Sequence, residues 1–124
     1  MTNNKKYDLE ERTAKFAERV IKLCKKIPIT PINESTIRQL IKASTSVGAN
    51  YCEADDAESA KDFKHKIGIC KKESRESKFW LRMFSVIEPK HKEEIIDLWR
   101  ESKELNLIFN SIFKKTRSKL AMKL

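Results

Sequence analysis

The sequence predicts an all-α protein: an antiparallel up-down-up-down four-helix bundle that forms a single domain over residues 1–124. Apolar residues recur with helical steps of three and four along four segments. Prolines and one acidic turn separate these segments, and the chain has only two glycines, whereas Lys, Glu, Ile, Leu and Ala are plentiful. A chain of 124 residues can bury a core without disulfides.

The first two helices are expected over residues 8–27 and from residue 33 or 35 to residues 52–54. Pro28 and Pro31 end the first helix, and Asn33 or Ser35 is the expected N-cap of the second. The apolar stripe of the first helix contains Leu9, Thr13, Phe16, Val20, Leu23, Cys24 and Ile27. That of the second contains Ile37, Leu40, Ile41, Ser44, Val47, Gly48 and Tyr51.

The third and fourth helices are expected over residues 60–87 and 92–115, with Ser59 as the N-cap of the third and Pro89 closing it. Residues 116–124 are expected to form a short, frayed basic tail. Gly48 and Gly68 lie inside helices, where close approach of a neighbouring helix is the ordinary explanation. The seams are Phe63, Ile67, Cys70, Ser74, Ser77, Leu81 and Phe84 in the third helix, and Ile95, Leu98, Trp99, Ser102, Leu105, Phe109 and Ile112 in the fourth.

Basic residues are distributed unevenly along the chain. The formal net charge is +9, and eight basic but only three acidic residues lie between Lys61 and Arg82. Phosphate binding needs positive charges in register along a surface. The candidate nucleic-acid-binding residues are the predicted surface positions Lys64, Lys71, Lys72, Arg75, Lys78 and Arg82 of the third helix, and Lys114, Lys115, Arg117 and Lys119 near the C-terminus. The alternative is an ordinary solvated basic surface.

The third helix carries more apolar residues than one packed stripe needs. The surplus residues on its third side predict an interface for self-association, and a wide core stripe is the alternative. These candidate oligomer-interface residues are Ile69, Trp80, Met83 and Ile87. Glu73 and Glu76 lie among them and are expected to pair with Arg12 or Arg38 across the bundle.

The sequence has no pattern typical of a catalytic site. No spacing places a nucleophile beside a base, so we expect a protein that is not an enzyme and has no cofactor. Cys24, Cys52 and Cys70 are spaced too widely for a C-x-x-C motif and predict reduced thiols in a cytoplasmic protein. Two histidines without ligand spacing predict no metal site. No apolar run approaches the roughly 18 residues that span a bilayer.

Three segments, YDLEERTAKFAERV, QLIKASTSVGANYCEA and KDFKHKIGICKKESRESKFWL, carry a resemblance to a known family. From Tyr7 to about Lys115 the chain resembles the four helix bundle protein family. This is also called the intervening-sequence protein or S23 family, whose members are encoded in intervening sequences of bacterial 23S ribosomal RNA genes and elsewhere. The resemblance implies an antiparallel bundle, a homopentamer and a basic surface suited to RNA or DNA. It carries over no catalytic residue.

These observations lead to two hypotheses of function. The first is a non-catalytic, oligomeric helical bundle that binds nucleic acid through its basic surface, with structured RNA as the favoured ligand. The alternative is a scaffold for a protein partner, with incidental basic charge. A related group of retroelement accessory proteins pairs with a reverse transcriptase, which would be one such partner.

Overall fold

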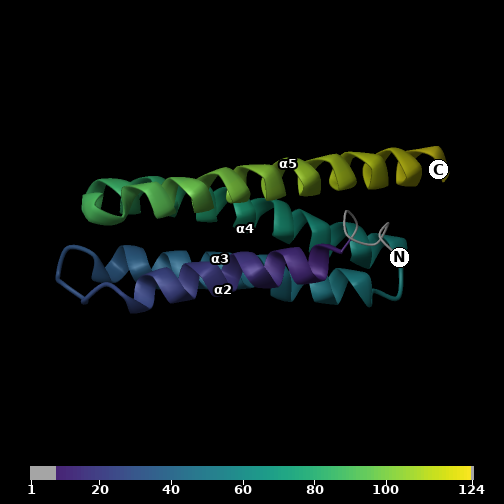
Figure 1. Ribbon diagram of the computed structural model, residues 1–124. Coiled ribbons are helices and arrows are strands. Elements are labelled where there is room, and N and C mark those ends of the chain that lie inside the picture. Colours follow the sequence, from purple (N-terminus) through teal and green to yellow (C-terminus); the bar gives the residue numbers. More distant parts are fainter. Residues whose placement is uncertain (1–7, 124) are drawn as a thin grey trace.

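The computed structural model describes residues 8–123, and the side chains of residues 8–116. They form four helices, α2 (Leu9–Lys25), α3 (Glu34–Asp55), α4 (Ala60–Ile87) and α5 (Lys92–Lys123), with a short 3-10 turn, η1 (Pro89–His91), before α5. Successive helices lie side by side and run in opposite directions, with connections at alternating ends (Figure 1). Each helix contacts its neighbours in the chain, and α2 also contacts α5. The predicted four-helix bundle is therefore confirmed.

The helix starts agree with the sequence, except for the role of one cap. The Asp8 and Ser59 side chains accept hydrogen bonds from the backbone N–H groups of Glu11 (3.1 Å) and Asp62 (3.0 Å), as N-caps do. Asn33 occupies the N-cap position of α3, but its side chain makes no capping bond. It is fully buried and donates instead to the carbonyl of Pro28 and to the carboxylate of Glu88, at 3.0 and 2.8 Å. Asn33 thus ties the α2–α3 connection to the C-terminal end of α4.

Helix α5 is longer than the sequence pattern predicts. It continues through Lys123, so the prediction of a frayed tail over residues 116–124 is wrong for residues 116–123. The physical reason is that neither proline nor glycine follows residue 115 to end the helix.

The core consists mainly of the predicted stripes, but five predicted apolar side chains are only partly buried: Ile41, Tyr51, Phe63, Trp99 and Ile112. Phe16, Phe84 and Phe109 are the largest side chains that are fully buried. Small polar residues also lie in the seams, and their hydroxyls donate to carbonyls of their own helix, so they cost little to bury. The buried serines and threonine of these seams are Thr13, Ser44, Ser74, Ser77 and Ser102.

Both helical glycines lie where another helix approaches closely. A Cβ atom on Gly48 would lie 3.0 Å from the Thr13 hydroxyl of α2, and one on Gly68 would lie 3.2 Å from the Phe113 ring of α5. The predicted close approach is confirmed at both positions. The two neighbours differ, however, since Thr13 is fully buried and Phe113 is only partly buried.

Candidate nucleic-acid interface

Helix α4 places half of its basic row directly against α5. The ammonium groups of Lys64 and Lys71 lie 5.4 and 4.7 Å from the centroid of the Phe113 ring. That of Lys78 lies 6.0 Å from the centroid of the Trp99 ring. An aromatic face attracts a cation at such distances. These three lysines are half-buried, so the prediction of simple surface positions is corrected: their stems fill the α4–α5 seam.

The other half of the α4 row is open to solvent. Lys72, Arg75 and Arg82 are exposed, as predicted for residues that meet a phosphate backbone. They follow the same helix at steps of three and seven, which keeps them on one side of α4.

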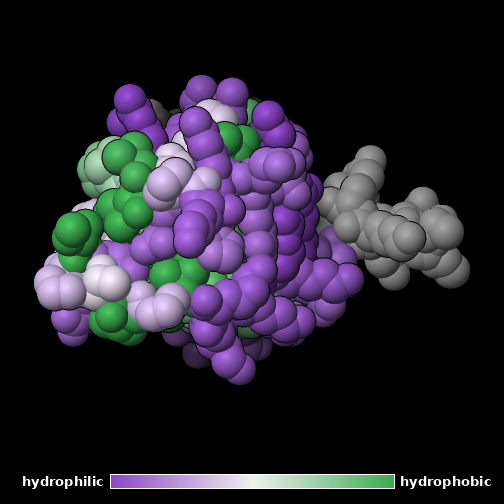
Figure 2. Space-filling view, turned by 60° about the vertical axis from the view of Figure 1, so that its left-hand side comes forward, coloured by the Kyte–Doolittle hydropathy of each residue, from purple (hydrophilic) through white to green (hydrophobic). Residues whose placement is uncertain are grey.

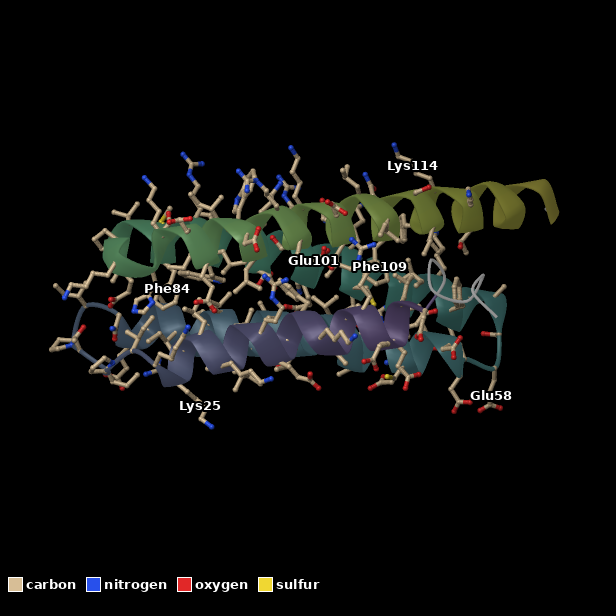
Figure 3. All side chains as sticks on the ribbon, viewed as in Figure 1. Lys25, Glu58, Phe84, Glu101, Phe109 and Lys114 are labelled. Carbon is tan, nitrogen blue, oxygen red and sulfur yellow. The ribbon has the colours of Figure 1, made fainter. Side chains whose placement is uncertain are left out.

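The candidate binding residues near the C-terminus do not all lie on the same side of α5. Lys114 and Lys115 are exposed, and Lys114 points away from the other helices (Figure 3). At about 100° per residue, Lys114 lies roughly 60° around α5 from Trp99, whereas Lys115 lies roughly 160° around it. Lys115 therefore projects away from α4. The side chains of Arg117 and Lys119 lie outside the described residues. We call the set Lys64, Lys71, Lys72, Arg75, Lys78, Arg82 and Lys114 the basic face.

The basic face has no acidic partners within the described part of the chain. None of its seven residues forms an ion pair there. Six basic residues elsewhere in the described part of the chain form ion pairs, whereas others, such as Lys22, Lys25 and Lys42, do not. The six are Arg12, Lys15, Arg19, Lys26, Arg38 and Lys66. The positive charge of the basic face is therefore not neutralised locally, and it remains available to an anionic ligand.

Sequence reasoning missed two members of this region. Lys103 of α5 places its ammonium 5.6 Å from the centroid of the Trp99 ring, so Trp99 has a lysine from each helix beside it. Its spacing of four residues from Trp99 is the signal that could have found it. The Asn106 side chain donates to the carbonyl of Lys71 at 2.8 Å and to the Ser74 hydroxyl at 3.3 Å. These bonds hold α5 against the basic row of α4.

The expected ion pairs of Glu73 and Glu76 with Arg12 or Arg38 are absent from the described residues. Arg12 instead pairs with Glu101 and Glu104 of α5, because α2 lies beside α5. Arg38 pairs with Glu34, one turn earlier on its own helix. Burial, followed by the nearby Glu76, raises the pKa of Glu73.

The predicted oligomer-interface residues Ile69, Trp80, Met83 and Ile87 are all half-buried in the single chain. Trp80 packs against the core and meets the Phe79 ring edge-on, with centroids 5.1 Å apart. Two neighbours that the sequence analysis left out are more exposed: Phe79 at 50% and Val86 at 76%. Seven residues separate them, which places both on one side of α4, and Phe79 lines a pocket there with Lys72 and Arg75 of the basic face. Figure 2, with the end that holds the α2–α3 connection turned forward, shows hydrophobic residues gathered at one side of that end.

No catalytic or metal-binding arrangement is evident in the described part of the chain. No group of three or more His, Cys, Asp or Glu residues could hold a metal ion there. Burial raises the pKa of the Cys24 thiol to about 11 and that of the Cys70 thiol to about 12. Both thiols therefore stay protonated and unreactive at neutral pH. None of the helices over the described residues is both long enough and apolar enough to cross a bilayer.

The fold and this surface define a class: small helical-bundle proteins with one basic side. Residues 5–111 match the family described as 23S rRNA-intervening sequence protein, and the chain belongs to that family. A solved structure of a protein of unknown function from the S23 ribosomal protein family, from Bacteroides thetaiotaomicron VPI-5482, is similar to this chain with a TM-score of 0.73. The two are 31% identical, over 85% of this chain and 97% of that one. A comparison with curated proteins gives no significant match. No catalytic family is indicated.

Proposed function

We propose that this protein is a non-catalytic, oligomeric helical bundle whose basic face binds nucleic acid, with structured RNA as the favoured ligand. The observation that carries the proposal is a cluster: the seven residues of the basic face gather along α4 and the adjoining part of α5, and none of them meets a carboxylate among the described residues. Unpaired lysines and arginines in register along a helix supply the positive surface that a phosphate backbone requires.

The decisive variant reverses the charge of the three exposed residues of the face. Lys72→Glu, Arg75→Glu and Arg82→Glu together leave the half-buried Lys64, Lys71 and Lys78 on their aromatic rings, so the α4–α5 seam stays intact. The matched control carries Lys22→Glu, Lys25→Glu and Lys42→Glu, three exposed lysines of α2 and α3. Both triple variants change the net charge by the same amount.

Fluorescence anisotropy with a labelled hairpin RNA, at several salt concentrations, measures the outcome. The α4 variant should lose about 100-fold or more in affinity. Its logarithmic salt dependence should become shallower by about two to three, because each phosphate contact contributes roughly 0.7 to 0.9. The control variant should keep its RNA affinity within a few-fold of wild type and should keep the wild-type salt dependence. Circular dichroism checks that both variants stay folded. Equal losses in the two variants would show that net charge alone drives binding, and retained affinity in the α4 variant would contradict the proposal.

The oligomeric part of the proposal rests on exposed apolar side chains of α4 that lie beside the basic face, because Phe79 lines one pocket with Lys72 and Arg75. Phe79 and Val86 are open to solvent in the single chain, and burying them would be favourable. The family resemblance adds the number five. Light scattering should show a stable oligomer at micromolar concentration, and Phe79→Glu with Val86→Glu should dissociate it. The control is Leu107→Glu, an exposed apolar position of α5.

The same exposed apolar side chains favour the second candidate function, a scaffold for a protein partner. Light scattering distinguishes self-association through this surface from binding of a different protein. A wild-type chain that remains a monomer would contradict the oligomer and leave Phe79 and Val86 for a different protein, such as a reverse transcriptase.

A further inference from the structure

A small pocket lies at one end of the α4–α5 seam. It has a volume of about 230 Å³ and is lined by Leu81, Arg82, Ser85, Ile95, Ile96 and Trp99. Its floor is apolar, since Leu81 and Ile95 belong to the core. One edge carries the exposed guanidinium of Arg82, and no carboxylate lines it. Pockets for drug-sized ligands usually measure roughly 300–1,000 Å³, so this one suits a single flat ring.

The Trp99 ring is the distinctive group of this pocket. It is only partly buried, and ammonium groups from both helices lie near it: that of Lys78 at 6.0 Å and that of Lys103 at 5.6 Å from the ring centroid. Lysine side chains are long and flexible, so they can leave the ring without moving either helix. An aromatic face with mobile cations around it can hold a flat ring and the negative charges attached to that ring.

We propose that the Trp99 pocket binds one unpaired base of an RNA. The base stacks on the Trp99 indole, Lys78 and Lys103 turn from the ring to the flanking phosphates, and Arg82 contacts the backbone from the pocket edge. The inference rests on the proposed function and deepens it. Phosphate contacts along the basic face position the RNA, and the pocket adds a preference for a bulge or loop over an unbroken duplex. A paired base cannot enter because its faces are covered by its neighbours in the helix.

Tryptophan fluorescence tests the pocket without altering it. In a Trp80→Phe protein, Trp99 is the remaining tryptophan. This protein is titrated with two hairpin RNAs of equal length, one fully paired in its stem and closed by a tight, stable loop, the other with a single bulged nucleotide. The bulged hairpin should quench Trp99 emission and bind roughly 5-fold or more tightly than the paired one, because stacking of one base is worth about 1–3 kcal/mol.

A pair of variants separates the pocket from general binding. Trp99→Leu should remove the preference for the bulged hairpin while keeping the affinity for the paired one. Tyr51→Leu is the matched control, since Tyr51 is also a partly buried aromatic residue but belongs to α3, away from the pocket, and this variant should keep the preference. The two variants are compared after circular dichroism has verified their folding.

Three outcomes are possible besides the expected one. If both hairpins bind equally and neither quenches Trp99, the pocket inference is wrong and the proposed function stands. If neither hairpin binds, both are wrong. If Trp99→Leu does not fold, the quenching measurement on the intact pocket decides alone.

Discussion

The two sides of helix α5 differ in whether their charged neighbours form ion pairs. Toward α2, acidic residues of α5 meet basic residues of α2 and of its C-cap. The Arg12 guanidinium bonds both carboxylate oxygens of Glu101, at 2.7 and 2.9 Å, and Lys26 pairs with Glu94 at 2.7 Å. Toward α4, α5 presents Trp99 and Phe113, and the lysines that lie over these rings have no carboxylate partner among the described residues. One side neutralises charge, and the other leaves it available.

This difference shows that charged residues between two helices need not contribute much to the free energy of folding. Surface ion pairs contribute at most about 1 kcal/mol, so the α2–α5 pairs mainly fix how the two helices align. The α4–α5 lysines lend their stems to packing and keep their ammonium groups for a ligand. The free energy of folding comes chiefly from the core, to which both sides are attached.

The largest expected effect concerns that shared core. Phe109→Ala should lower the free energy of unfolding by about 3–5 kcal/mol, since the fully buried ring packs on Tyr51 and would leave a cavity. Figure 3 shows Phe109 and Glu101 projecting from α5 toward the other helices. Leu107→Ala, at a position 57% exposed, should cost less than about 0.5 kcal/mol. Urea denaturation measures both, and equal losses would mean that the core does not dominate.

The two glycines should respond differently to alanine. Gly48→Ala should destabilise the protein by about 1 kcal/mol, because the new Cβ meets Thr13, whose buried hydroxyl is held by the carbonyl of Leu9. Gly68→Ala should be neutral or stabilising by up to about 1 kcal/mol, since the contact is with the edge of a ring that is only partly buried and alanine favours the helix. Thermal denaturation ranks the variants. A stabilised Gly48→Ala protein would show that α2 and α3 pack more loosely than described.

The smallest expected changes in stability come from replacing one arginine on each side of α5, and these variants test most directly whether the two sides differ. Arg12→Met should cost about 1 kcal/mol, because the hydrogen bond to Glu101, which also raises the pKa of Arg12, is lost. It should leave RNA affinity unchanged. Arg82→Met should leave stability within about 0.5 kcal/mol, since Arg82 is exposed, but should weaken RNA binding and its salt dependence. Chemical denaturation and anisotropy are measured on both. If both variants changed stability and RNA affinity in the same way, the α2-facing and α4-facing sides of α5 would not differ in function.

Much of the fold and part of the candidate site followed from residue order. The stripes, the Ser59 cap and the bounds of α4 come from local rules, in which one turn of helix decides which residues share a face. The same arithmetic placed Lys72, Arg75 and Arg82 together, because they belong to one helix. Two local predictions still failed: the end of α5 was placed too early, and Asn33 bonds Glu88, 55 residues away, instead of capping α3.

Only the tertiary structure decided which helix faces meet. Residue order cannot show that Arg12 reaches Glu101, because the two lie 89 residues apart and meet only once α2 packs beside α5. Nor can it show that Lys71 and Lys78 lie over rings of α5 while Phe79, beside Lys78 in the chain, stays half exposed. The sequence by itself determined the helices, their apolar faces and the excess of positive charge. Packing decided which of those charges were neutralised, because neutralisation depends on distances between helices.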